Sequence, residues 1–395
     1  MNASERSGGP TGAAAQERAG PPARDGLLYR GTGEVLPDVP YEERDWPEGP
    51  RWRTFSGGPC QPRPPEDGEP DRRLGPVGAV RRPSAAEVRL VNAALLLRRP
   101  LLVTGRPGVG KSGLAYRIAR ELRLGRVLQW PVTSRTTLAS GLFEYDVIGR
   151  AQAGQAWYAA QRAEAAAGTG AAGAVEEGTG EERALEARPV EARAEIGDFV
   201  QLGPLGTALL PHRLPRVLLI DELDKGDADL PNDLLTLFED GWYAVPPLVR
   251  VKHQTPRAVV HTSDPGKIAP VVEGIVRTRA FPIVIMTSNG EREFPEAFMR
   301  RCLRLDMRDP DAEALGELVA AHFSDRLGDS QRKLIGDFMT RSEQADGLAA
   351  DQLLNAAHLA TSGAYAFGEG DSTEWQAVLR AIWHPLNSDG AGRGD

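Results

Sequence analysis

The chain has 395 residues, of which 41% are hydrophobic and 26% are charged, and its formal net charge is −8. This length allows two or three domains, and the apolar fraction is sufficient for a sizeable core. An acidic balance argues against a dedicated nucleic-acid binder, because such proteins present basic surfaces to phosphate. The two cysteines and six histidines are too scattered to form a disulfide framework or a cluster of metal ligands.

The sequence shows no sign of secretion or of membrane insertion. The first 30 residues lack the apolar core of a signal peptide, and no run approaches the ~20 apolar residues of a membrane span. We therefore expect a cytoplasmic protein without a membrane span.

The N-terminal 82 residues are rich in proline and glycine. Residues 1–25 contain almost no large apolar residues, which predicts disorder. Residues 26–82 carry aromatic residues at intervals, which favours a segment that lies extended over a domain surface. A fully disordered linker is the alternative for this composition. The aromatic residues that would anchor an extended segment are Tyr29, Tyr41, Trp46, Trp52 and Phe55.

Regular structure is expected from residue 83 onward. Ser84 and Glu87 have the spacing of a capping box at the start of a helix. An apolar run at residues 101–104 predicts a strand, and Leu114 and Ile118 belong to a helical stripe that follows it.

Between this strand and this helix, residues 105–112 read Gly-Arg-Pro-Gly-Val-Gly-Lys-Ser. The pattern G-x-x-x-x-G-K-[ST] between a strand and a helix is a phosphate-binding loop, whose backbone N–H groups point at a polyphosphate. A chance lysine in a glycine-rich turn would lack these flanks. Lys111 is suited to the β- and γ-phosphates, and Ser112 to Mg²⁺. The predicted nucleotide-binding residues are Gly105, Arg106, Pro107, Gly108, Val109, Gly110, Lys111, Ser112 and Gly113.

A second strand is expected at residues 127–132, followed by a break in the pattern. Residues 159–195 consist mainly of alanine, glutamate, glycine and arginine and contain no aromatic residue. Such a stretch cannot bury much surface, so we interpret it as a mobile insertion that is helical in part.

A wholly apolar run at residues 217–220 predicts a strand that is buried on both faces. Asp221 and Glu222 follow it directly. Phosphoryl transfer requires neutralised oxygens and a water in line with the leaving group. Asp221 is therefore a candidate for the Mg²⁺ shell that Ser112 also touches, and Glu222 for orienting the water. A solvated loop start is the alternative for an Asp-Glu pair.

Another buried strand is expected at residues 283–287, and Asn289 lies just beyond its end. Asn289 is a candidate for a hydrogen bond to the γ-phosphate or the water, although an Asn-Gly turn needs no function. Arg300 and Arg301 end the next apolar stretch and would suit a helix tip that reaches a neighbouring subunit. An ordinary solvated pair is equally compatible with them.

From residue 309 the pattern becomes helical. Helices are expected near residues 311–323, 330–341, 351–360 and 373–383. Buried strands that alternate with helices, followed by helices alone, indicate an α/β domain and then a helical domain.

Together these residues resemble an AAA+ ATPase, most closely the MoxR-like branch, over roughly residues 83–385. Residues 105–112 match Walker A, residues 217–222 match Walker B, and Asn289 matches sensor 1. Residues 294–301, Phe-Pro-Glu-Ala-Phe-Met-Arg-Arg, resemble the pattern Leu-Pro-Glu-Ala-x-x-Asp-Arg-Phe, which places Arg301 at the arginine finger.

The resemblance implies a parallel sheet of order 5-1-4-3-2, flanked by helices and followed by a helical lid. It implies a nucleotide-binding domain at residues 83–308, with the insertion at 159–195 near the branch's helix-2 insert, and a lid at residues 309–395. It also implies ATP and Mg²⁺ as cofactors, hydrolysis at the interfaces of a homo-oligomeric ring, usually hexameric, and chaperone-like remodelling of a protein partner. Such a partner often carries a von Willebrand factor A domain.

The sequence departs from the family pattern in two places. Arg300 stands where the pattern has aspartate, so either arginine is a candidate for the finger. The helix that usually begins with a sensor-2 arginine shows none in residues 348–354, and Arg341 is an alternative. Residues 245–281 are long and basic in places, so they suit either a pore-facing hairpin or a surface excursion.

Two other functions remain open for this sequence. A nucleic-acid motor or restriction-type NTPase would need a basic channel, which the net charge disfavours. A switch that binds ATP without hydrolysing it fits the missing sensor-2 arginine, but the Asp-Glu pair opposes it.

Overall fold

The computed structural model describes residues 27–37, 46–75, 83–170, 194–323, 328–344, 348–362 and 373–383. The disorder expected for residues 1–25 and the anchoring role of Tyr41 concern residues outside these ranges. Most of the expected insertion, from residue 171 to 193, also lies outside them. No helix in the described ranges is long and apolar enough to cross a membrane.

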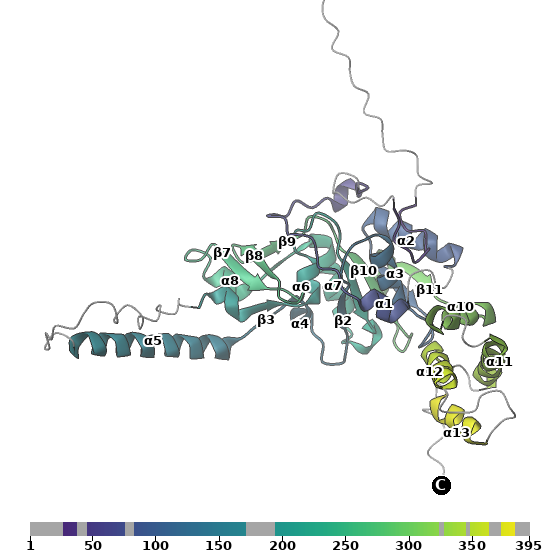
Figure 1. Ribbon diagram of the computed structural model, residues 1–395. Helices are drawn as coiled ribbons and strands as arrows, with labels where there is room; N and C mark the ends of the chain where they lie inside the picture. The colour runs from purple at the N-terminus through teal and green to yellow at the C-terminus, as the bar shows by residue number, and fades with distance from the viewer. Residues whose placement is uncertain are drawn as a thin grey trace, which may run out of the picture.

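The central sheet is parallel and has five strands (Figure 1). Its spatial order is β11-β1-β10-β5-β2, which is 5-1-4-3-2 when these strands are numbered along the chain, as predicted. The register places Thr104 beside both Ser288 and Asp306. The polar carboxyl ends of three strands therefore meet at one edge. The strands are β1 (Leu101–Thr104), β2 (Leu128–Pro131), β5 (Val217–Asp221), β10 (Ile283–Ser288) and β11 (Leu303–Asp306).

Alternate residues of the central strands point to opposite faces of the sheet, as the two-residue period of a strand requires. Leu218 and Ile220 belong to one buried cluster, whereas Val217 and Leu219 belong to the other. Both faces are covered, which explains why these strands have uninterrupted apolar sequences.

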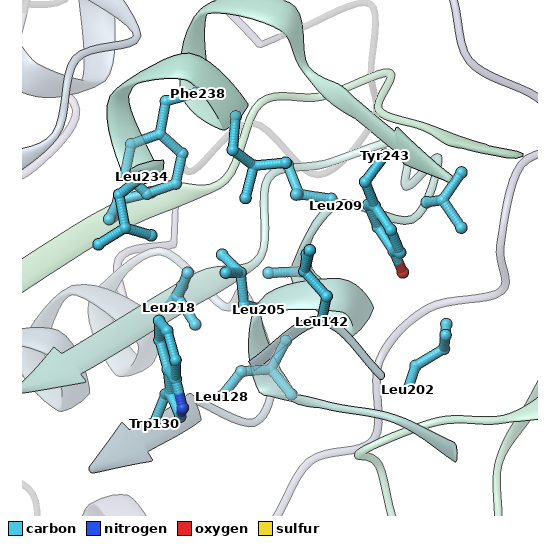
Figure 2. Packing of buried hydrophobic residues seen from close by; sticks show 14 of the residues in the cluster. Leu128, Trp130, Leu142, Leu202, Leu205, Leu209, Leu218, Leu234, Phe238 and Tyr243 are labelled. Atoms are coloured by element: carbon cyan, nitrogen blue, oxygen red, sulfur yellow. The ribbon is translucent and has the colours of Figure 1, made fainter. Parts of the chain in front are cut away.

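One face of the sheet is covered by α4 (Leu138–Leu142), α6 (Pro204–Ala208) and α7 (Leu230–Asp240). Figure 2 shows the contact, in which Leu218 and Trp130 of the sheet pack with Leu205 and Leu234 of these helices. The expected helix at residues 231–240 is thus present. It ends at Gly241, whose φ of 65° is a left-handed conformation that favours glycine.

The other face is covered by α2 (Ala85–Leu97) and α3 (Gly113–Glu121). Ser84 caps α2, because its side chain accepts the Glu87 N–H at 3.1 Å. In a full capping box the Glu87 carboxylate would also accept the Ser84 backbone N–H, but here it has other partners. The Glu87 carboxylate is buried and instead accepts the Tyr29 hydroxyl at 2.8 Å and pairs with Arg117 at 3.1 Å.

A second sheet of six strands, in the order β3-β4-β7-β8-β9-β6, packs beside the first. Three of its strands, together with α8 (Pro246–Arg250), lie within residues 245–281. This segment is therefore part of a folded sheet, and neither alternative from the sequence describes it fully. The strands are β3 (Phe143–Tyr145), β4 (Val200–Leu202), β6 (Trp242–Ala244), β7 (Arg257–His261), β8 (Ile268–Val272) and β9 (Ile275–Arg277).

The described part of the N-terminal segment lies across the body of the protein. Tyr29 and Trp46 are buried in the second core cluster, and Phe55 stacks on Phe281 with ring centroids 5.6 Å apart. Trp52 is 83% exposed, so its expected anchoring role is wrong. The segment also contains the short helix α1 (Glu69–Leu74), which packs on α3.

Two further parts complete the chain. Helix α5 (Val147–Gly170) extends away from the body (Figure 1) and includes the start of the expected insertion. The C-terminal region is helical and has its own buried cluster, which contains Phe338, Leu353 and Trp383. Its helices are α10 (Ala312–Phe323), α11 (Gly328–Gln344), α12 (Ala350–Thr361) and α13 (Thr373–Ile382).

Candidate functional site

The phosphate-binding loop connects β1 to α3, in the expected context. Gly105, Gly108 and Gly110 have φ values of 148°, 79° and 87°, which side chains rarely adopt. A Cβ on Gly105 would lie 2.4 Å from the Met307 carbonyl oxygen, and one on Gly108 would lie 2.4 Å from the Ala349 Cβ. Glycine is therefore required both for the turn and for the close approach of neighbouring chain segments.

The remaining loop residues differ in their surroundings. Arg106 and Pro107 are exposed, whereas Val109 is buried in the core cluster beneath the loop. Ser112 and Gly113 form the start of α3, so the positive end of the helix dipole lies at the loop. This arrangement favours an anion at the loop, because the N–H groups of a helix's first turn and the helix dipole point the same way.

Lys111 lies at the centre of the loop and is 7% exposed. Its Nζ donates to three oxygens at 2.7 Å each: the carbonyls of Gly105 and Arg106, and Oδ1 of Asn289. Burial lowers the pKa of Lys111, while the carboxylates of Asp224, Asp221 and Glu222 act in the opposite direction. A lysine ammonium has three N–H donors, and here all three point at acceptors.

Asp221 ends β5 and is held by donors from three other elements. Its Oδ1 accepts the hydroxyl of Ser112 at 2.7 Å and the hydroxyl of Thr287 at 2.6 Å. Its Oδ2 accepts Nε2 of Gln129, on β2, at 3.3 Å. The structure thus brings together Ser112 and Asp221, the two residues expected to share a magnesium ion.

Asn289 follows β10 and is positioned by a buried carboxylate. Asp224 is 3% exposed, and its Oδ2 accepts the backbone N–H groups of Asn289 and Glu291 at 2.9 and 3.1 Å. These bonds fix the turn after β10, so the Asn289 side chain reaches Lys111.

Glu222 lies beside this cluster but its carboxylate contacts another partner. Its backbone N–H donates to Thr287 Oγ1 at 2.8 Å, and its Oε2 accepts from Lys225 Nζ at 2.9 Å. The side chains of Glu222 and Lys225 are 45% and 41% exposed. Solvent screening makes such a pair weak, so the Glu222 carboxylate can be released from it at little cost.

Arg300 and Arg301 lie in a different cluster, at the end of α9 (Glu296–Arg301). Arg300 pairs with Glu296 within its own helix at 2.7 Å, and both side chains are highly exposed. Arg301 pairs with Glu239 of α7 and is about half exposed. Arg341 lies within the helical region, where its guanidinium is 6.0 Å from the centroid of the Trp383 ring.

A cavity of about 170 Å³ lies between the phosphate loop and the helical region. Arg106, Gly108 and Val109 form its wall on the loop side, and Leu315, Phe338 and Leu348 are among the residues on the opposite side. Arg106 also approaches Asp309 to 3.7 Å. The cavity has polar and apolar walls of similar extent and opens beside the phosphate loop.

Three polar residues of the site were not singled out from the sequence: Thr287, Asp224 and Gln129. Thr287 lies within an apolar run, where a hydroxyl reads as a tolerated strand residue. Asp224 had a detectable signal, because a third carboxylate follows Asp221 and Glu222 within three positions. Gln129 has no such signal in the sequence, because its contact with Asp221 depends on the pairing of β2 with β5.

The donor set fits a magnesium ion bound together with phosphate. Ser112 and Asp221 offer one hydroxyl and one carboxylate, and Mg²⁺ in nucleotide sites keeps several waters and takes other ligands from phosphate. Within the described ranges, no group of three or more histidine, cysteine or acidic residues could hold a metal by itself. A metal held by protein ligands alone is therefore not what this edge of the sheet provides.

Residues 100–302 match the family model of the AAA domain, dynein-related subfamily. A comparison with curated protein sequences gives no match. Among solved structures, the chain is similar to NtrX from Brucella abortus in complex with ADP, at 12% identity and a TM-score of 0.34 over 78% of this chain and 57% of that one. The NtrX complex with ATP gives 14% identity and a TM-score of 0.34, over 74% and 55%. The chain thus spans little more than half the length of either NtrX chain. Because the family model covers just over half of this chain, including both β1 with its phosphate loop and β5 with Asp221, the chain belongs to the AAA family, dynein-related subfamily.

Proposed function

We propose that this protein is a magnesium-dependent ATPase that works as a MoxR-like AAA+ ring and remodels a protein partner. The observation that carries the proposal is the contact between the Ser112 hydroxyl and the Asp221 carboxylate at 2.7 Å, beside an ammonium with three acceptors. Joined at one edge of a parallel sheet, these groups provide what a nucleoside triphosphate and its metal ion require.

Each residue has a role that follows from its position. When bound, Mg²⁺ neutralises the phosphate oxygens of ATP and makes the γ-phosphate a better electrophile. Ser112 and Asp221 would hold the metal ion. Lys111 would exchange the carbonyls of Gly105 and Arg106 for phosphate oxygens, and its burial keeps the ammonium from being screened by bulk water.

Glu222 and Asn289 would act on the attacking water. The Glu222 carboxylate would leave Lys225 and accept a hydrogen bond from the water, which orients and polarises it. Asn289 would offer its amide to the water or the γ-phosphate, from a position that Asp224 fixes. Orientation of this kind lowers the barrier because the water is already in line when the bond to phosphorus forms.

The cavity between the phosphate loop and the helical region suits the base of the nucleotide. Its lining combines the apolar side chains of Leu315 and Phe338 with the polar side chain of Ser342. Ligand pockets bind aromatic groups through apolar walls and use a few polar groups to orient them. Closure of the helical region on the base would then couple nucleotide binding to movement of α10–α13.

The ring and the partner rest on family membership and resemblance. Arg301 is about half exposed at the end of a surface helix, where a neighbouring subunit could receive it as an arginine finger. A partner with a von Willebrand factor A domain is the class that the MoxR-like resemblance implies. Its retention by the purified, ATP-loaded ring would support this part of the proposal, and no retention would oppose it.

The ATPase proposal is tested by phosphate release from ATP in the presence and absence of Mg²⁺. We expect magnesium-dependent turnover by the full chain, and a loss of at least about 100-fold in Glu222→Gln. Lys111→Ala should lose nucleotide binding. Lys267→Ala and Glu144→Gln are the matched controls, because both residues are exposed on the second sheet or its turns, and they should keep wild-type turnover.

Two results would contradict the proposal. Unchanged turnover in Glu222→Gln would show that the water is oriented elsewhere. A wild-type chain that binds ATP with Mg²⁺ but releases no phosphate would instead identify a switch that uses ATP for assembly alone.

A further inference from the structure

A helix outside the family-matched region packs against the nucleotide site. Helix α1 lies in the N-terminal segment and docks on α3, the helix that begins at the phosphate loop. Arg120 of α3 donates to the Asp71 carboxylate at 2.8 Å and to the Gly75 carbonyl at 3.0 Å. Near the other end of the contact, a Cβ on Gly113 would lie 3.6 Å from Leu74. The two helices are thus fixed to each other at two points.

Arg73 extends from α1 to the residues behind Asp221. Its Nη2 donates to Oε1 of Gln129 at 3.0 Å, and its guanidinium lies 4.9 Å from the centroid of the Tyr116 ring. The Tyr116 hydroxyl donates to the same Gln129 oxygen at 3.2 Å. The amide nitrogen of Gln129 is left facing Asp221, to which it donates at 3.3 Å.

We propose that Arg73 is a positioning residue for the magnesium site and acts through Gln129 on Asp221. A glutamine amide has an acceptor end and a donor end. Two donors on its oxygen, Arg73 and Tyr116, hold the donor end toward the carboxylate. The orientation of Asp221 then depends on α1, and so on the docking of the N-terminal segment. This inference rests on the proposed function, because it assigns Asp221 to a magnesium ion.

The charge of Arg73 by itself would have the opposite effect. A cation close to a magnesium site repels the ion, so removing that cation would strengthen magnesium binding. Loss of an outer partner of a metal ligand weakens metal binding, commonly by ten- to a hundredfold. The sign of the change in magnesium affinity therefore separates positioning from charge.

The experiment measures the affinity of the full chain for a fluorescent ATP analogue during a titration with MgCl₂. We expect Arg73→Ala to raise the Mg²⁺ concentration at half-saturation about three- to tenfold. The effect should be smaller than that of losing Gln129, because Arg73 contacts Asp221 only through Gln129. Affinity for the analogue in EDTA should stay at the wild-type value. Arg72→Ala is the matched control. Arg72 and Arg73 both pair with Glu69, at 2.7 and 3.3 Å, but the Arg72 side chain is 66% exposed. This variant should leave the titration unchanged.

A double-mutant cycle tests the route through Gln129. Gln129→Leu should raise the half-saturating Mg²⁺ concentration about tenfold, and Arg73→Ala should add nothing in that background. Arg73→Met keeps an apolar stem on Tyr116 without a donor, and it replaces Arg73→Ala in the cycle if the melting temperature shows that the alanine variant does not fold.

Three results would overturn the inference. Magnesium binding that tightens or does not change in both Arg73 variants would remove the positioning role. Additive effects of Arg73→Ala and Gln129→Leu would remove the route through Gln129. If the wild-type affinity for the analogue is the same at every Mg²⁺ concentration, the magnesium site itself fails. That last result contradicts the proposed function. A wild type that needs Mg²⁺ and Arg73 variants that match it would contradict only the role of Arg73.

Discussion

At the scale of single residues, Glu222 shows how the site is held in place. Its φ and ψ of 60° and 49° are left-handed, a conformation that costs a residue with a Cβ roughly 1–2 kcal/mol. The Thr287 hydroxyl offsets this cost, because it accepts the Glu222 N–H and donates to Asp221 Oδ1. One buried hydroxyl thus fixes both the residue proposed to orient water and the residue proposed to hold the metal ion.

We expect Thr287→Val to lower the free energy of unfolding by about 2 kcal/mol, because it leaves the Glu222 N–H without its acceptor in a partly buried site. Turnover should fall about tenfold as Asp221 loses a donor. Thr287→Ser keeps the hydroxyl and should retain most of both. Urea unfolding and phosphate release measure the two effects, and a valine variant that matches the wild type in both would contradict this role of Thr287.

The residues that could be predicted from sequence are those whose roles are encoded locally. Lys111 and Ser112 belong to one short motif, and Asp221 and Asn289 each follow a buried strand, so chain position alone placed them at the same edge. The contacts of Asp224 with the Asn289 turn, and of Gln129 with Asp221, depend on pairing between distant segments. No periodicity or spacing in one sequence encodes such pairings.

At the scale of elements, the same distinction separates the two sheets. The strands β1, β5 and β10 are short apolar runs between turn signals, and each was predicted within one or two residues. Most strands of the second sheet are only three residues long, too short for a pattern. β7 and β8 do alternate buried with less buried residues. Their exposed positions include the apolar residues Val259, Ile268 and Val272, so the sequence does not show this alternation.

Helix α5 is a separate case, because the composition of its second half predicts that it buries little surface. Most of its described side chains beyond Gly154 are exposed, and Tyr158 is 58% exposed. The helix extends from the body in Figure 1. Its root is close to where the chain returns, because Ala153, Gly154 and Ala194 line the same cavity of about 280 Å³.

We expect that residues 155–193 can be replaced by a short Gly-Ser linker without loss of the fold. The melting temperature should change by no more than about 2 °C, since the described side chains of this stretch, at residues 155–163, are mostly exposed. Ile196 is buried near the base of α5, and Ile196→Ala should instead lower the free energy of unfolding by about 2 kcal/mol or more. Calorimetry compares the two variants. A linker variant as destabilised as Ile196→Ala would show that residues 155–193 contribute to the stability of the fold.

At the scale of the whole molecule, three parts meet at the proposed nucleotide site. The N-terminal segment reaches it through α1, the AAA domain provides the phosphate loop and Asp221, and the helical region closes the cavity beside Gly108. The N-terminal attachment is extensive, because the Glu121 carboxylate accepts the backbone N–H groups of Arg30, Gly31 and Gly33. Composition predicted an extended segment, but it could not predict that the segment's helix would lie behind Asp221.

The proposed ring gives a prediction at this scale. With ATP and Mg²⁺ at micromolar protein, Glu222→Gln should have a mass several times the 42.6 kDa of one chain by light scattering. Arg301→Ala should still assemble but lose turnover by at least about 100-fold, as expected for an arginine finger. Arg300→Ala should keep turnover, because Arg300 pairs within its own helix. A protein that stays monomeric with ATP would leave Arg301 without a neighbouring site.

The most direct measurement of the central claim identifies the nucleotide that the protein retains after incubation with ATP and Mg²⁺ and rapid removal of free nucleotide. We expect ADP on the wild type, ATP on Glu222→Gln and no nucleotide on Lys111→Ala. ADP on Glu222→Gln, in the amount found on the wild type, would contradict the assignment of Glu222. Wild-type retention by Lys111→Ala would contradict the assignment of the phosphate site.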